Sequence, residues 1–109
     1  MTVAAFTAQA GSASANSATI DVSNLSLLSS NLALQVITAS FDAGDSTLKI
    51  QHSSNGTNWD DVADSTITVA TGTASQTLLM TNRMCNFYRV VYTRTSVTTG
   101  TFTVNLNFN

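Results

Sequence analysis

The sequence has no glutamate and no proline, and only one lysine, one histidine and one cysteine. Charged residues make up 9% of the chain, against roughly 25% in an ordinary soluble domain. The net charge is −2, and the three arginines (Arg83, Arg89 and Arg94) form no basic run with Lys49. Such a run is what binds the phosphates of a nucleic acid, so we expect no nucleic-acid partner.

The single cysteine, Cys85, excludes an intrachain disulfide. Beside Met84 and Phe87 it is expected to be a small buried hydrophobic residue. No stretch approaches the roughly 20 apolar residues of a membrane span, so no membrane partner is expected. The first residues, MTVAAFTAQAGSASANS, lack the basic and continuous apolar segments of a secretory signal, and synthesis in a cytoplasm is expected.

Threonine, serine and asparagine take the place of the charged residues. They number 18, 14 and 10, or 42 of the 109 residues. Threonine favours strands because its branched Cβ packs well on a pleated surface. Serine and asparagine favour turns because their side chains bond to nearby backbone groups. This composition predicts an all-β protein with many turns.

Apolar and polar residues alternate in several short segments. The pattern is clearest in residues 101–108, where Phe102, Val104, Leu106 and Phe108 are expected to face the core. Turn signals separate about eight such segments at spacings of about 8 to 12 residues. A chain of this length forms one core. The predicted fold class is therefore a single antiparallel β-sandwich, jelly-roll-like, with about eight short strands.

The ends of this domain are predicted from composition. Residues 1–16 are expected to form a flexible N-terminal arm, because they are small and weakly charged, although residues 3–9 also fit a strand. Residues 17–109 then form the sandwich domain. Residues 32–41 carry apolar side chains on both faces of a strand, which predicts a strand covered on both sides.

The stretch SSNGTNWDDVADSTITV, residues 53–69, holds the only tryptophan and three of the six aspartates. Asn55-Gly56 is a hairpin signal, since both residues tolerate a positive φ. Trp59 is expected to plug the end of the sandwich, the commoner use of a lone indole. The alternative is an exposed platform that stacks against a sugar or contacts another subunit.

The aspartates of this stretch are expected to cap the turn through local hydrogen bonds. A calcium ion is the alternative, because several oxygen ligands lie close in sequence. The spacing does not match an EF-hand loop, and the chain has no glutamate for bidentate binding. We therefore predict no metal. The candidate binding edge comprises Asn55, Asn58, Trp59, Asp60 and Asp61.

Catalytic residues are hard to find in this sequence. His52 is the only histidine and shares strand parity with Leu48 and Ile50, which places it on the inward face near a strand end. No serine lies in a G-x-S-x-G motif. We predict a protein that is not an enzyme, has no catalytic residues and binds no cofactor.

Three segments together resemble a known family. They are LKIQHSSNGTNWDDV, FYRVVYT and the closing GTFTVNLNF. These are similar to small β-sandwich proteins encoded among the structural genes of tailed bacteriophages. The matching positions are Gln51, Ser53, Asn55, Gly56, Asn58 and Trp59, then residues 88–93, then Gly100 onward. The resemblance covers about residues 32–109.

This resemblance implies a virion component, such as a head decoration or minor capsid protein, and brings no catalytic residues. The expected partners are the major capsid protein or other virion proteins, and further copies of the chain, a trimer among the options. The expected location is the virion, after synthesis in the host cytoplasm. The same hairpin also resembles carbohydrate-binding jelly rolls of the discoidin type, so an adhesion module with a glycan ligand is the alternative.

Overall fold

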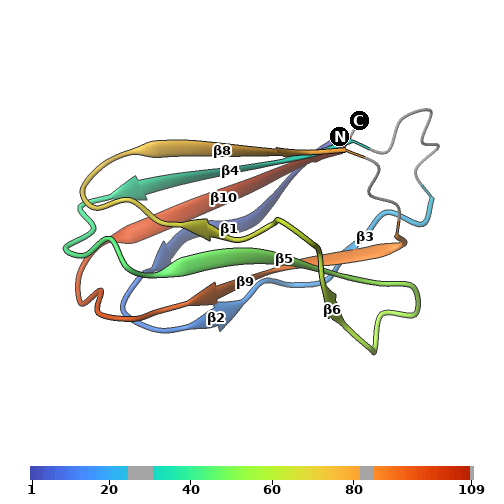
Figure 1. Cartoon of the computed structure of the whole chain (residues 1–109), viewed down its shortest axis with the longest axis horizontal. Helices are drawn as coiled ribbons and strands as arrows, with labels where there is room; N and C mark the ends of the chain where they lie inside the picture. Colours follow the sequence, from blue (N-terminus) through green and yellow to red (C-terminus); the bar gives the residue numbers. More distant parts are fainter. Residues whose placement is uncertain (25–30, 82–84, 109) are drawn as a thin grey trace.

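The alternating segments pair into two antiparallel sheets in a computed structural model that describes residues 1–24, 31–81 and 85–108 (Figure 1). Sheet A has the strand order β1-β10-β4-β8. The bounds of its strands are Thr2–Ala10 for β1, Thr101–Phe108 for β10, Leu32–Ala39 for β4 and Ser75–Met80 for β8.

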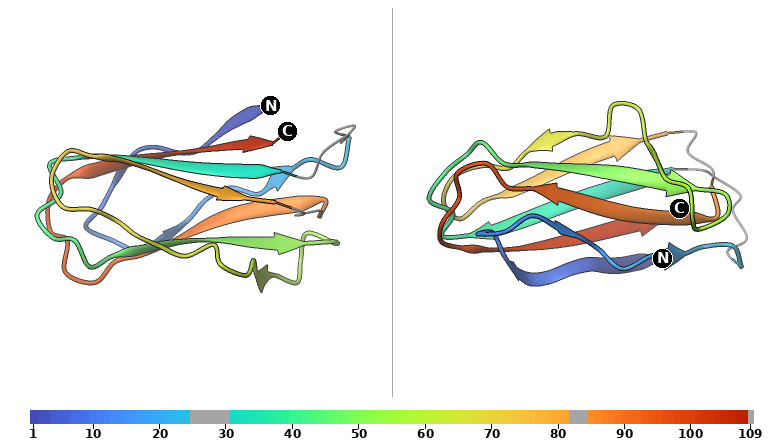
Figure 2. Two further views of the ribbon diagram at one scale, coloured as in Figure 1. Left: turned by 45° about the horizontal axis from the view of Figure 1, so that its top comes forward. Right: turned by 90° about the horizontal axis from the view of Figure 1, so that it is seen from below.

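Sheet B is built around two long strands, β9 and β5, which pair along their whole length. Two short strands pair with β9 and two with β5. The bounds are Ala15–Asn16 for β2, Ile20–Asp21 for β3, Thr47–Ser53 for β5, Asp60–Asp61 for β6, Ile67–Thr68 for β7 and Phe87–Thr93 for β9. From β1 onward the chain passes from one sheet to the other, a jelly-roll-like winding that confirms the predicted fold class (Figure 2).

The core lies between the sheets and follows the predicted alternation. All four residues expected from 101–108 to face inward are buried. At one end of the sandwich Phe102 packs against Tyr92 with ring centroids 4.4 Å apart, and Phe6 and Phe41 complete the cluster. At the other end Tyr88 packs against Phe108 at 5.2 Å. Aromatic pairs thus join the two sheets at both ends.

The expected N-terminal arm is wrong for most of its length. Residues 2–10 form β1, an edge strand paired with β10, and Phe6 is buried at 5% exposure. Ala15 and Asn16 pair with β9. The alternative expectation of a strand over residues 3–9 is confirmed, and Phe6 of this strand fills a position between the sheets. The sandwich therefore includes residues on both sides of position 16.

The prediction that residues 32–41 are covered on both faces is also wrong. Leu32, Leu34 and Val36 are buried, but Ile37 on the opposite face is 41% exposed. Nothing in the described residues packs over this outer face of sheet A.

None of the described residues forms a helix long and apolar enough to cross a membrane.

The loops at one end of the sandwich are tied together by aspartates. Asp42 accepts hydrogen bonds from the backbone N–H and the hydroxyl of Thr98, and Asp45 does the same for Ser96. These bonds hold the β4–β5 connection to the β9–β10 connection. At the opposite end the N-terminal amine of Met1 donates to the Phe108 carbonyl at 2.9 Å, so the start of the chain lies beside the end of β10 (Figure 2).

Candidate functional site

The loop between β5 and β6 is organised by two of its own polar side chains. The Ser53 hydroxyl accepts the backbone N–H groups of Asn55 and Gly56 at 3.2 and 2.8 Å. The Asn55 side-chain oxygen accepts the N–H groups of Thr57 and Asn58, both at 2.9 Å. These bonds satisfy four backbone donors within the turn. The polar groups of Ser53 and Asn55 are thus engaged inside the loop.

The predicted hairpin forms, since β5 pairs antiparallel with β6, but only one of its two signal residues has a positive φ. Gly56 has a φ of 76°, while Asn55 is not among the residues with positive φ. A type I′ turn needs positive φ at both central positions. The chain instead makes a wider loop, and β5 and β6 pair through Gln51 with Asp61 and His52 with Asp60.

Trp59 lies outside the core, so its predicted role as a plug is wrong. Its ring is half-buried, and the guanidinium carbon of Arg89 sits 4.5 Å from the ring centroid. Arg89 lies between Tyr88 and Val90, which face the core, and therefore points outward from β9. The indole packs on the outer face of sheet B through a cation–π contact.

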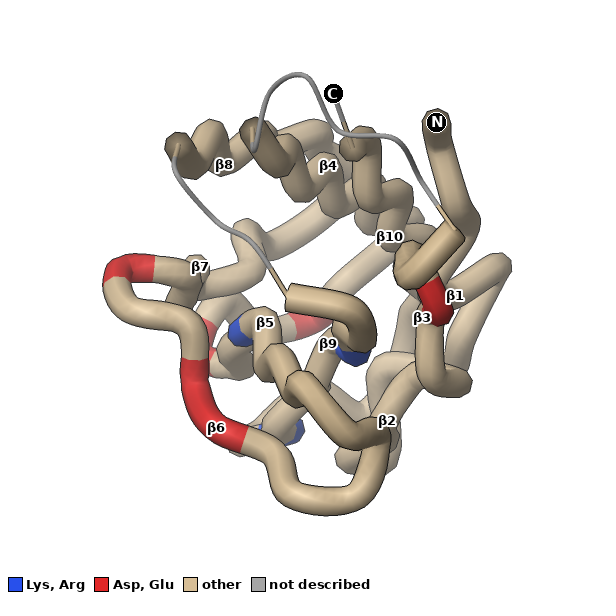
Figure 3. The backbone as a smooth tube through the Cα atoms, turned by 90° about the vertical axis from the view of Figure 1, so that its right-hand side faces the viewer, with Lys and Arg blue, Asp and Glu red and all other residues tan. Residues whose placement is uncertain are grey.

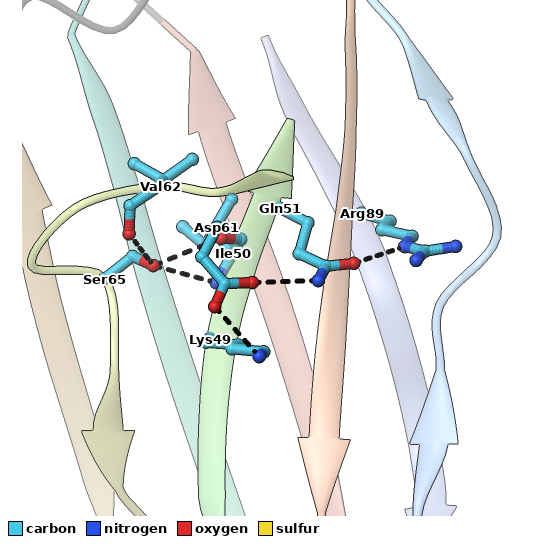
Figure 4. Close-up of polar contacts among 7 residues, drawn as sticks. All are labelled: Lys49, Ile50, Gln51, Asp61, Val62, Ser65 and Arg89. Carbon is cyan, nitrogen blue, oxygen red and sulfur yellow. Dashed lines mark hydrogen bonds and ion pairs between the residues drawn. The ribbon is translucent and has the colours of Figure 1, made fainter. Parts of the chain in front are cut away.

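Arg89 begins a chain of polar contacts across three strands (Figure 4). Its Nε donates to Gln51 Oε1 at 2.8 Å, and Gln51 Nε2 donates to Asp61 Oδ1 at 2.8 Å. The other carboxylate oxygen of Asp61 accepts Lys49 Nζ at 3.1 Å. The hydrogen bond from Gln51, followed by that from Lys49, lowers the pKa of Asp61 below its ordinary value.

The aspartates therefore do not cap the turn as predicted. Asp61 bonds across the sheet, and within the described residues no hydrogen bond reaches the side chain of Asp60 or Asp64. The buried hydroxyl of Ser65 organises the next turn instead. It accepts a hydrogen bond from the Ile50 N–H at 3.1 Å and donates one to the Val62 carbonyl at 2.7 Å. This serine was not predicted, because nothing in the sequence distinguishes it from the other serines.

The candidate binding edge is only partly brought together. Trp59 and Asp61 join the contacts on sheet B, while Asn55 and Asn58 bond to each other at 3.1 Å within the loop. Asp60 is exposed on β6. In the described part of the chain no three His, Cys, Asp or Glu side chains converge where a metal ion could bind.

His52 lies where its strand parity predicted, on the inward face near the end of β5. It is beside Tyr88, and the two ring centroids are 6.4 Å apart. Its Nδ1 is buried and has no hydrogen-bond partner among the described residues. The adjacent Ser53 hydroxyl donates to Asn55. Cys85 is half-buried against the core, and its backbone N–H donates to the Tyr88 hydroxyl at 3.0 Å. These contacts bring no nucleophile and base together.

Charge is divided unequally between the two sheets. None of the residues in β1, β10, β4 and β8 has an ionisable side chain. In Figure 3 the tube of these strands is tan, without blue or red, and the charged positions lie on sheet B and in the loops. The outer face of sheet A carries threonine, asparagine and glutamine together with Ile37 and Leu79, which are 41% and 75% exposed.

Comparison of the chain with protein-family models, with curated proteins and with solved structures gives no match. The resemblance to phage structural proteins therefore depends on the three sequence segments alone.

Proposed function

We propose that this chain is a non-enzymatic structural protein of a virus particle, which decorates the capsid as an oligomer and docks through the outer face of sheet A. The observation that carries the proposal is the absence of ionisable side chains from all four strands of that sheet. A charge costs much more to remove from water than an uncharged polar group. A face without charges can be covered by a neighbour at low cost.

The same face offers contacts suited to a protein partner. Leu79 and Ile37 provide exposed apolar area, which gains free energy when a neighbour covers it. A shallow depression of about 290 Å³ lies among side chains of all four strands: Thr2, Ala33, Gln35, Thr77, Asn105 and Asn107. Amide and hydroxyl groups both donate and accept, so they can match the polar atoms of an opposing surface.

Sheet B has the features of a face that remains in water. Asp61 and Lys49 form an ion pair with side chains 57% and 33% exposed, and burial of such a pair is unfavourable unless its geometry is very good. The two sheets therefore differ in how readily a neighbour covers them. Jelly-roll sandwiches serve in viral capsids and in lectins alike, so the fold by itself does not choose between the two.

The first test is the copy number of the protein in purified particles from its source, measured by quantitative mass spectrometry against the major capsid protein. A copy number in the hundreds that scales with capsid subunits supports decoration. A handful of copies moves the protein to a tail or vertex position. Absence from particles overturns the proposal.

The docking face is tested with isosteric charge substitutions. Asn105→Asp places a charge in the depression on sheet A, and Asn58→Asp adds the same charge in the β5–β6 loop. Each changes one amide to a carboxylate of the same shape. We expect Asn105→Asp to lower the occupancy of particles and Asn58→Asp to leave it unchanged. Equal occupancy for both variants contradicts docking through sheet A.

Carbohydrate binding is the second candidate function, and the half-buried position of Trp59 on the surface favours it. A sugar would stack on the part of the indole that Arg89 leaves open. The fluorescence of Trp59 should then change on titration with glycans. Because Trp59 lies outside the core, Trp59→Ala should fold, and glycan binding by that variant would eliminate this candidate.

A further inference from the structure

β8 forms an edge of sheet A that is open to another strand. Within the described residues it pairs only with β4. An edge strand presents unpaired N–H and C=O groups, which natural proteins protect with charges, prolines or bulges. β8, with the sequence SQTLLM, has no charge and no proline, and its register with β4 is continuous over all six residues.

The other edges of the sandwich carry such protection. β1 has register shifts on both sides of Phe6, and Ala8 adopts a φ of 45°. β6 consists of the two aspartates 60 and 61, and β2, β3 and β7 have two residues each. Among the described edge strands, β8 alone is uncharged, six residues long and without a register shift.

The backbone groups that point outward from β8 follow from the ladder with β4. Thr38 N–H donates to the Ala74 carbonyl at 2.9 Å, so residue 74 directs its backbone groups toward β4. In an antiparallel ladder every second residue does the same. The residues between them direct their N–H and C=O groups to the open edge. They are Ser75, Thr77 and Leu79.

We propose that β8 is the pairing site for a second copy of this chain. The two β8 strands run antiparallel about a two-fold axis at Thr77, with Thr77 opposite Thr77 of the second copy. Ser75 of each copy then lies opposite Leu79 of the other. All the outward backbone groups are satisfied by about six hydrogen bonds, and the two copies of sheet A become one eight-stranded sheet.

A second copy fits this edge because the strand is complementary to itself. The three outward residues are arranged symmetrically about Thr77, so one register satisfies both strands. The chain is acidic overall with a net charge of −2, but β8 has no charge to repel its copy. At the β6 edge, by contrast, Asp60 and Asp61 would face each other.

The side chains at this edge also gain from the pairing. Leu79, 75% exposed, would lie over Ser75 of the second copy, and half-buried Leu78 would be covered on its open side. Threonines directly opposite each other in an antiparallel pair interact favourably. The paired segment has six residues and is about 20 Å long at about 3.3 Å each. A standard interface has roughly 20–30 residues on each side. We therefore expect a dimer that dissociates on dilution.

The test uses charge at the symmetry axis. Like charges directly opposite each other disfavour strand pairing and opposite charges favour it. Thr77 is exposed, so Thr77→Lys and Thr77→Asp should both fold, as far-UV circular dichroism will show. Ala4→Lys, an exposed position on the opposite edge of sheet A, is the matched control.

Sedimentation velocity over a range of concentrations gives the dissociation constant of each protein. We expect the unmodified chain and Ala4→Lys to dimerise alike, and each Thr77 variant alone to dimerise at least about tenfold more weakly. An equimolar mixture of Thr77→Lys and Thr77→Asp should regain the dimer. A monomeric unmodified chain, unchanged dimerisation of Thr77→Lys, or no recovery in the mixture each overturns the pairing.

This inference specifies the oligomer in the proposed function, but its test contains no virus particle. The two ideas therefore fail separately. A dimer with the expected charge response, in a protein absent from particles, leaves the pairing in place and removes the virion role. Full particle occupancy by a chain that is monomeric at every concentration leaves the virion role in place and removes the pairing.

Discussion

Gly100, directly before β10, is a position where a single added methyl group should strongly destabilise the fold. Its φ is 106°, a conformation that residues with a side chain rarely adopt. A Cβ built at this position would lie 2.7 Å from the Ser40 carbonyl oxygen and 2.8 Å from that of Ala39. Both oxygens belong to the backbone at the end of β4. They cannot rotate away as a side chain would.

The cost of Gly100→Ala has two parts. A residue held at an unfavourable positive φ costs about 1–2 kcal/mol, and forcing extra atoms into a packed site costs about 1–3 kcal/mol more. We therefore expect a loss of about 2–5 kcal/mol in the free energy of unfolding. Domains of this size have about 5–15 kcal/mol in total. The melting temperature should fall by about 8 °C or more.

Gly72 provides the matched control. Its φ is 83°, also positive, but a Cβ there would meet no atom within 4 Å. Gly72→Ala should therefore show only the backbone part, about 1–2 kcal/mol. Urea unfolding followed by circular dichroism gives both values, with the slope of the transition as a check that each variant unfolds in one step. Equal losses for the two variants would refute the steric argument.

Three further predictions concern the site and the core. Tyr92→Phe removes the hydroxyl that donates to the buried Gly11 carbonyl at 2.8 Å, so urea unfolding should show a loss of about 1–3 kcal/mol. Burial raises the pKa of Tyr92. The stabilisation that its protonated hydroxyl provides is therefore complete below about pH 10 and is lost as the pH rises through the raised pKa. Thermal unfolding at alkaline pH should show this loss in the unmodified chain but not in Tyr92→Phe. Trp59→Ala removes only a surface contact with Arg89, so its melting temperature should fall by less than that of a core substitution, and collapse of the fold would contradict the position outside the core. Hydrogen bonds from the β9–β10 connection lower the pKa of Asp42, so its stabilisation is present above about pH 4 and lost as the pH falls through the lowered pKa; melting curves of Asp42→Asn should therefore depend less on acid than those of the unmodified chain.

The candidate site shows where local sequence was sufficient. The parity of Leu48, Ile50 and His52 correctly predicted the inward face of β5, where Leu48 and Ile50 are buried. Pairing of Gln51 with Arg89 brings the two side chains together. That register involves residues 38 positions apart, and no local pattern predicts it.

Trp59 shows why the rest could not be predicted. A lone tryptophan supplies large apolar area whether it fills a core or covers a surface, so its type does not decide its location. The location depends on Arg89, which the β5–β9 ladder places beneath the ring. In the same way, Phe6 was assigned to an arm because its neighbours are small, and only pairing of β1 with β10 gives it a place in the core.

The amino-acid sequence by itself determined the class of fold, the inward face of the long strands and the scarcity of charge. These follow from local physics, since β-branched residues and alternating polarity act over a few neighbouring positions. Only the tertiary structure decided that the uncharged strands gather in one sheet, that β8 lies at its open edge and that the polar contacts gather on the other sheet. Those features depend on which distant strands pair, and strand pairing is selected by burial of the whole core at once.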